Sequence, residues 1–226
     1  MTEIKICGIT NGDDAACAAE HGVHALGFIF YRESPRSLSA DDAARIIRHL
    51  PPAVVTVGVF VNHDLREVRE IAEVCRLDMI QLHGDESPEY AAALSDYAII
   101  RAIAPRSGDD CAMLALYPAA AVLVDGYDRR RYGGTGKTAD WNVALLMRER
   151  YPLILSGGLN AGNLEDALRR VAPRAIDVSS GCEASPGKKD HDKIRDVIEI
   201  VQRFDGDSGT AGTGIFRKAK QRVQRR

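Results

Sequence analysis

The chain has 226 residues, which suits one large domain or two small ones and is long enough to enclose a sizeable core. Hydrophobic residues make up 45% and charged residues 27%, with a formal net charge of -2, a composition typical of a globular protein and unlike that of a disordered chain. No apolar run approaches the roughly 20 residues that a membrane helix needs, so no membrane association is expected.

The first residues and the cysteines indicate the compartment. The chain starts with a charged, strand-like segment at 2–6, which lacks the apolar stretch of a secretory signal. The five cysteines are scattered and include no C-x-x-C pair: Cys7, Cys17, Cys75, Cys111 and Cys182. We therefore expect neither a disulfide framework nor a metal site, and a reducing cytoplasm fits best.

Strand-like and helix-like segments alternate along most of the chain. The predicted strands are 4–9, 25–30, 54–61, 79–83, 98–104 and 121–125, with two more at the start and end of 153–181. The predicted helices are 13–21, one after Ser39, 64–75, 89–94, 109–117, 140–150, one within 153–181, and 191–204.

Eight strand–helix pairs in about 200 residues predict an α/β fold, a single-domain (βα)8 barrel over residues 1–204. The strands are apolar enough to be buried on both faces, as in a parallel sheet. A doubly wound open sheet is the main alternative. It more often carries G-x-G-x-x-G after its first strand, and the segment 7–12 (CGITNG) does not match that pattern.

Residues 205–226 differ in composition from the rest of the chain. They begin with a Gly/Ser/Thr-rich, linker-like stretch and end with basic residues, and they carry a net charge of +4 against -6 for the remainder. We expect a flexible, disordered tail whose removal leaves fold and turnover intact. Its basic residues could contact nucleic acid or, weakly, an acidic partner, although no nucleic-acid function is expected. It could equally be an idle extension or a short frayed helix.

The segment 153–181 contains two consecutive strand-end turns that could bind phosphate. Gly157 and Gly158 allow a ligand to approach the backbone, and Asn160 is placed to cap the following helix. The next strand ends in Ser179, Ser180 and Gly181. Backbone N–H groups and a helix dipole can hold a phosphate here without an obligatory Lys or Arg, although ordinary tight turns would have similar sequences.

Four further residues fall at the ends of predicted strands or in the loops after them. Cys7 lies on the first strand, Arg36 follows the second, His83 ends the fourth and Asp125 ends the sixth. Each has a structural explanation when taken alone. In a barrel, however, all four would lie at the carboxyl-terminal rim, where active sites occur, facing the predicted phosphate site.

The segment 132–138 (YGGTGKT) superficially resembles a nucleotide-binding P-loop. The Walker pattern requires a glycine five residues before Gly136, and Arg131 occupies that position. No strand leads directly into the segment either. The sequence therefore does not predict ATP binding.

Taken together, these motifs resemble the phosphoribosylanthranilate isomerase family of tryptophan biosynthesis over residues 3–204. The matching motifs are 5–11 (KICGITN), 34–36 (SPR), 81–85 (QLHGD), 133–138 (GGTGKT) with 140–141 (DW), 156–160 (SGGLN), 177–181 (DVSSG) and 184–190 (ASPGKKD). Family members commonly have Pro-Glu where this chain has Ala161 and Gly162, which weakens the predicted helix start.

The resemblance implies a cofactor-independent and metal-independent Amadori rearrangement of a phosphorylated aminosugar. N-(5-phosphoribosyl)anthranilate would become 1-(2-carboxyphenylamino)-1-deoxyribulose 5-phosphate. By similarity, Asp125 is the general acid, Cys7 is the general base and Arg36 lies near the anthranilate carboxylate. The glycines and serines of the last two loops form the phosphate site. Gln81, His83 and Asp177 line or position the substrate site.

Two other functions stay open from the sequence. One is a non-catalytic phosphate-binding barrel, which the presence of both Cys7 and Asp125 disfavours. The other is the related histidine-pathway isomerase, whose two similar halves carry paired carboxylates and two phosphate sites. This chain has one such acid and one such phosphate motif.

Overall fold

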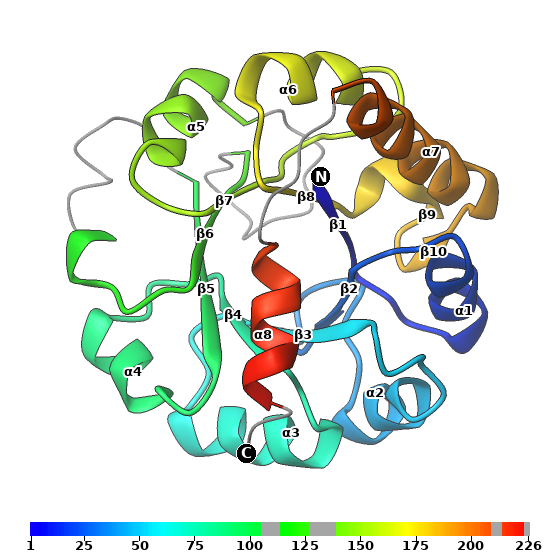
Figure 1. The fold of residues 1–226 in the computed structure, drawn as a ribbon. Helices are drawn as coiled ribbons and strands as arrows, with labels where there is room; N and C mark the ends of the chain where they lie inside the picture. The colour runs from blue at the N-terminus through cyan, green and yellow to red at the C-terminus, as the bar shows by residue number, and fades with distance from the viewer. Residues whose placement is uncertain (105–113, 127–138, 209–213, 224–226) are drawn as a thin grey trace.

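The computed structural model describes residues 1–104, 114–126, 139–208 and 214–223. Eight parallel strands form a closed barrel in sequence order, with β8 pairing back onto β1. The strands are β1 (Glu3–Cys7), β2 (Ala25–Ile29), β3 (Val55–Phe60), β4 (Met79–Leu82), β5 (Ala98–Ile103), β6 (Ala121–Val124), β7 (Leu153–Leu155) and β8 (Ala175–Val178). The predicted (βα)8 barrel is confirmed, and Figure 1 shows the strands ringed by helices.

Helices surround the barrel, and the last of them lies across the end at which the strands begin (Figure 1). They are α1 (Gly12–Glu20), α2 (Ala40–Ile47), α3 (Leu65–Cys75), α4 (Pro88–Ala93), α5 (Trp141–Arg148), α6 (Leu164–Val171), α7 (His191–Ser208) and α8 (Ile215–Val223). Most of the helix predicted at 109–117 lies outside the described residues, and 114–116 form a 3-10 turn. A short hairpin, β9 (Glu183–Ser185) with β10 (Lys188–Lys189), follows β8.

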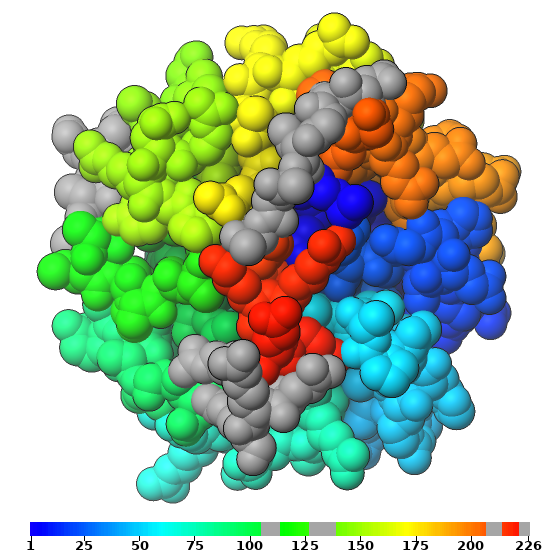
Figure 2. All heavy atoms as spheres, in the orientation of Figure 1, coloured from blue at the N-terminus to red at the C-terminus, as the bar shows by residue number. Residues whose placement is uncertain are grey.

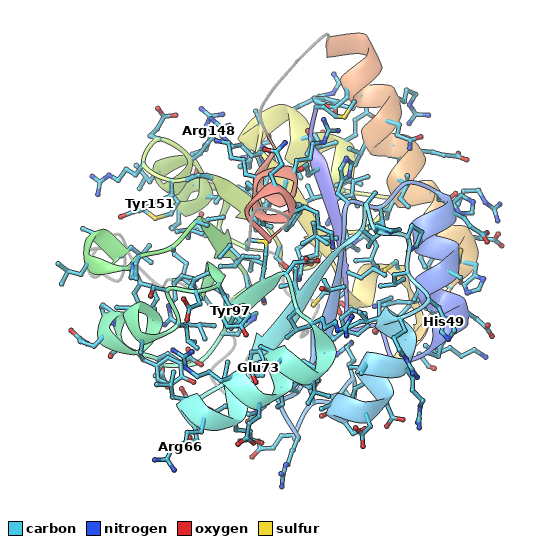
Figure 3. The ribbon with its side chains drawn as sticks, turned by 60° about the horizontal axis from the view of Figure 1, so that its bottom comes forward. His49, Arg66, Glu73, Tyr97, Arg148 and Tyr151 are labelled. Carbon is cyan, nitrogen blue, oxygen red and sulfur yellow. The ribbon has the colours of Figure 1, made fainter. Side chains whose placement is uncertain are left out.

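Sequence patterns explain these helices. Asn11, Ser39, Asp64 and Ser87 each cap a helix by accepting a backbone N–H bond with the side chain. The apolar stripe of α3 packs on the barrel through Val68, Ala72 and Cys75. Its polar face is turned outward, as the labelled side chains of Arg66 and Glu73 show in Figure 3. None of the described helices combines the length and hydropathy needed to cross a membrane.

The side chains of β1 alternate between the barrel interior and the core around the barrel. Because strand residues alternate between faces, Glu3, Lys5 and Cys7 share one face of β1 and are buried, while Ile4 and Ile6 pack in the core on the other face. Small and apolar residues fill the interior towards the amino-terminal strand ends. They include Ala25, Val55, Val57, Met79, Ala98, Ile100, Ala121, Leu123, Ile154 and Ala175.

The C-terminus differs from the expected disordered tail. Helix α7 extends to Ser208, and α8 lies across the end of the barrel where the strands begin (Figure 1). Ile215, Phe216 and Ala219 of α8 are buried in the same cluster as the interior strand residues. In the space-filling view α8 occupies the middle of this face (Figure 2).

The sequence-based expectation failed because it relied on composition. The linker-like residues 205–214 and the basic residues of 215–226 hid a short apolar helical face at positions i, i+1 and i+4. The apolar side of this helix packs on the apolar residues at the open end of the barrel. These residues are distant in sequence, so the contact could not be predicted from the local pattern.

Buried polar contacts fix α8 in place. The Glu3 carboxylate accepts hydrogen bonds from the backbone N–H groups of Phe216 at 2.8 Å and Arg217 at 3.2 Å, at the positive end of the helix. Lys220 Nζ lies 2.6 Å from Asp78 Oδ2, and Asp78 also accepts a bond from the Thr56 backbone. α8 is therefore an integral cap of the barrel.

Replacing Phe216 tests this cap. Phe216 is fully buried, so we expect Phe216→Ala to destabilise the protein by about 3–5 kcal/mol, typical of a core phenylalanine. For a chain of this size that lowers Tm by roughly 6–20 °C in a calorimetric scan. Gln221→Ala, at an exposed position of α8, is the control and should leave Tm almost unchanged. Equal Tm values for both variants and the parent would show that α8 does not support the barrel.

Candidate active site at the carboxyl ends of the strands

A polar cavity opens at the opposite end of the barrel from α8. Seven of the residues predicted from sequence line it together: Cys7, Arg36, Gln81, His83, Asp125, Asp177 and Ser179. Other lining residues include Tyr31, Ser34 and Ser156, with apolar walls from Ile29, Val59 and Val61. The cavity therefore combines a thiol, carboxylates, an imidazole and a guanidinium in one place.

Cys7 lies at the end of β1 and is 5% exposed. Two residues earlier on the same face, the fully buried Lys5 places Nζ 2.9 Å from Asp177 Oδ1 on β8. Burial acts to lower the pKa of Lys5, but the Asp177 carboxylate and Cys7 together outweigh it and the pKa is raised, so Lys5 is a cation. Burial raises the pKa of the Cys7 thiol, and the Lys5 charge opposes that rise.

Asp125 follows β6 and is 8% exposed. Its Oδ1 accepts the backbone N–H of Gly126 at 2.8 Å, and its Oδ2 is 3.3 Å from His83 Nε2. On the far side of that ring, His83 Nδ1 lies 2.9 Å from Gln81 Nε2. The imidazole is thus held between an amide and the carboxyl group, which fixes the orientation of Asp125.

Arg36 is held in a buried, two-point ion pair. Its Nε and Nη2 each donate to one oxygen of Glu183 at 2.7 Å. This arrangement uses one edge of the guanidinium and leaves Nη1 for another acceptor. Gly8 makes the approach possible, because a Cβ at its φ of +76° would lie 2.6 Å from Arg36 Cδ.

Lys189 on β10 joins three parts of the site. Its buried Nζ donates to the Cys7 carbonyl at 2.6 Å, to the Ser179 carbonyl at 3.0 Å and to Glu183 Oε1 at 3.1 Å. One ammonium therefore fixes the end of β1, the loop after β8 and the carboxylate that orients Arg36. The β9–β10 hairpin is a scaffold for the site.

The two loops of the predicted phosphate site lie side by side. Gly157 and Gly158 have φ values of +80° and +63°, and a Cβ on Gly157 would lie 2.5 Å from the Gly126 backbone nitrogen. A Cβ on Gly181 would lie 1.8 Å from the Leu159 carbonyl oxygen, so only glycine permits the contact between the loops. Ser180 and Gly181 begin a 3-10 turn, where backbone N–H groups are left for outside acceptors.

The predicted cap residue Asn160 lies one turn before the first residue of α6. The N-cap of α6 is Asn163, three residues later, and it makes no side-chain capping bond. Asn160 instead accepts the backbone N–H of Gly162 and donates to the carbonyl of Gly158 at 3.0 Å. The Asn160 carbonyl also accepts the backbone N–H groups of Asn163 at 3.1 Å and Leu164 at 3.0 Å, so Asn160 shapes both the glycine loop and the turn that leads into α6.

Two buried polar atoms of the cavity residues have no hydrogen-bond partner in the described part of the chain. They are Gln81 Oε1 and Ser179 Oγ. Buried polar groups are normally paired, so their placement is typical of a ligand site. The described residues contain no cluster of three or more His, Cys, Asp or Glu suited to a metal ion.

Residues 4–200 match the family model described as N-(5'phosphoribosyl)anthranilate (PRA) isomerase. The chain belongs to the phosphoribosylanthranilate isomerase family. It is 50% identical over 206 residues to the N-(5'-phosphoribosyl)anthranilate isomerase of Syntrophus aciditrophicus, covering 91% of this chain and 90% of that relative.

Solved isomerase structures agree with this assignment. The phosphoribosyl anthranilate isomerase of Thermotoga maritima superposes with a TM-score of 0.83 at 40% identity, covering 90% of this chain and all of the other. A second structure, of phosphoribosyl anthranilate isomerase in complex with reduced 1-(o-carboxyphenylamino)-1-deoxyribulose 5-phosphate, gives a TM-score of 0.80 at 39% identity, with the same coverage.

Sequence reasoning missed the residues that support this isomerase site. Lys5, Glu183 and Lys189 are buried and charged, and each contacts a predicted site residue. Lys5 had a usable signal, because it lies in an apolar strand at i-2 from Cys7 and so on the same face. The sequence gives no comparable signal for Glu183 and Lys189, because their partners are far away in sequence. The segment 132–138 lies outside the described residues.

Replacing Glu183 tests the Arg36 anchor. Burial acts to raise the pKa of Glu183, but Arg36 and Lys189 hold it below its ordinary value. Glu183→Gln leaves two buried cations unpaired, so we expect a loss of about 3–5 kcal/mol at pH 7. Because the pKa of Glu183 is lowered by folding, its contribution to stability is fully present above its pKa in the unfolded chain, about 4.3. The contribution is lost as the pH falls through the lower pKa of Glu183 in the folded protein.

The measurement is urea unfolding of parent and variant from pH 7 into acid. The two stabilities should converge at low pH. Glu165→Gln is the control, because Glu165 forms an exposed pair with Arg169 on α6 and such pairs contribute little to stability. A pH-independent difference between parent and Glu183→Gln would contradict the ion-pair account.

Proposed function

We propose that this protein isomerises N-(5-phosphoribosyl)anthranilate to 1-(2-carboxyphenylamino)-1-deoxyribulose 5-phosphate, with Asp125 as acid and Cys7 as base. The observation that carries the proposal is that both side chains line one cavity from non-adjacent strands, β1 and β6, next to the glycine and serine loops. The reaction needs a proton delivered at one point of the sugar and a proton removed at another.

Asp125 performs the first step. It protonates the furanose ring oxygen, the C1–O bond breaks, and the nitrogen lone pair forms the C1=N bond of a Schiff base. The contacts of Asp125 with Gly126 and His83 keep its carboxyl group in one orientation while the ring opens.

Cys7 performs the second step. Its thiolate removes the proton from C2, the electrons of that bond form the C1–C2 double bond, and the iminium nitrogen becomes neutral. The resulting enolamine tautomerises to the ketone. A thiolate is needed because a neutral thiol is a poor base. Every bonding change uses groups of this chain and the substrate.

Binding is divided between two ends of the substrate. The free edge of Arg36 suits the anthranilate carboxylate, because guanidinium and carboxylate match in geometry. Gly157, Gly158, Ser179, Ser180 and Gly181 offer backbone N–H groups and hydroxyls to the phosphate. Gln81, His83 and Asp177 position the reacting groups. The odd number of scattered cysteines supports a cytoplasmic location.

Conservative replacements of the two reacting groups test the mechanism. Asp125→Asn keeps the shape but cannot deliver a proton, so we expect kcat to fall by about 10³-fold or more. Cys7→Ser substitutes a hydroxyl of the wrong basicity and should be similarly impaired. Fluorescence of phosphoribosylanthranilate measures turnover, and binding of the reduced product analogue serves as the control for an intact site. Near-parental kcat in either variant would remove that residue from the chemistry.

A larger side chain at Gly158 tests the phosphate site. Gly158→Val should raise KM strongly because it blocks close approach of the phosphate to the loop. Its positive φ also strains any other residue, so Gly22→Val, at a φ of +92° after α1, is the matched control. Inorganic phosphate should compete with the substrate in the parent and in Gly22→Val, and poorly in Gly158→Val. Equal competition in all three would place the phosphate elsewhere.

A further inference from the structure

The barrel interior contains a buried charge that the reaction itself does not use. Lys5 is 0% exposed, and its ammonium lies at mid-barrel between the α8 cap and the cavity. Placing an ammonium away from water is costly even when it is paired, and an apolar residue of similar size would often be as stable. The position of this charge relative to Cys7 provides a reason for it.

Gly27 shows how close the charge is to the thiol. In the β1–β2 register Cys7 pairs with Gly27, and a Cβ on Gly27 would lie 2.7 Å from Cys7 Sγ and 3.1 Å from Lys5 Nζ. Both groups thus share the space that the missing side chain leaves. Their distances to this one point place them within about 6 Å of each other, close enough for the cation to stabilise a thiolate.

The other charges around Cys7 do not replace Lys5. The Asp177 carboxylate raises the pKa of Cys7, but its effect is smaller than the lowering by Lys5. Lys189 also favours the thiolate, but its ammonium binds backbone carbonyls and Glu183, and its effect is smaller still. Arg36 is neutralised by Glu183, and Cys182 is a buried thiol whose pKa is raised to about 11, mainly by burial.

We propose that Lys5 is a positioning residue whose buried ammonium, anchored by Asp177, stabilises the thiolate form of Cys7 that removes the C2 proton. Asp177 then has a defined task, which is to keep Lys5 charged and directed at the barrel axis. The ammonium neither gains nor loses a proton in the step: the C2–H bond breaks and the S–H bond forms. This role rests on the proposed function of Cys7.

The test compares the titration of Cys7 in the full-length parent and in Lys5→Met. The ultraviolet absorbance of the Cys7 thiolate is followed against pH, with the Cys7→Ser form of each protein subtracted. Removing the cation should move the midpoint upward by about 1–3 pH units. The alkaline rise of kcat should move by the same amount, with KM almost unchanged. Turnover of Lys5→Met should therefore recover at high pH, which a purely structural defect would not allow.

Two further variants keep the test decisive. Lys188→Met removes an exposed lysine from the neighbouring hairpin and should shift neither midpoint. If Lys5→Met does not fold, Lys5→Met/Asp177→Asn removes the unpaired carboxylate as well. Its midpoint should still rise, because Lys5 affects the thiol more than Asp177 does.

The outcomes separate this inference from the proposed function. An unchanged thiol midpoint in Lys5→Met, or in the double variant, would overturn the role of Lys5 even if Cys7→Ser is inactive. A shifted thiol midpoint with an unshifted kcat profile would exclude Cys7 as the base and, with it, the catalytic role of Lys5.

Discussion

The ion pair between Lys5 and Asp177 is the constraint on which the site depends. It lies inside the barrel, with Nζ and Oδ1 2.9 Å apart and both side chains almost fully buried. Removing either partner would leave the other charge buried and unpaired, which would lower the stability of the protein by about 3–5 kcal/mol. The pair also joins the first and last strands of the barrel, which are neighbours in the closed sheet. Closure of the barrel and the charge beneath Cys7 are therefore linked.

One face of β1 serves both ends of the molecule. Glu3 binds the backbone of α8, Lys5 anchors the middle, and Cys7 reaches the cavity. The strand alternation places these three side chains in line along the barrel axis. Apolar packing dominates at the α8 end, while polar groups collect at the other end. This division agrees with the general rule that active sites of such barrels lie at the carboxyl ends of the strands.

The sequence predicted what depends on local patterns. Alternating apolar strands and capped helices predicted the barrel, and strand-end positions brought Cys7, His83 and Asp125 to one cavity. It failed where the partner is remote. The apolar face of α8 has meaning only against the open end of the barrel, and Glu183 is an ordinary loop carboxylate until Arg36 is placed beside it. Helix α6 begins one turn after Asn160, because helix starts are uncertain by several residues when the following residues are Ala and Gly.

The most direct measurement is a crystal structure of this protein with the reduced product analogue. We expect the phosphate against the backbone of Gly158 and Gly181, the anthranilate carboxylate on the free edge of Arg36, and the sugar carbons between Cys7 Sγ and the Asp125 carboxyl group. A complex in which the phosphate lies on other residues, or in which C2 faces away from Cys7, would contradict it.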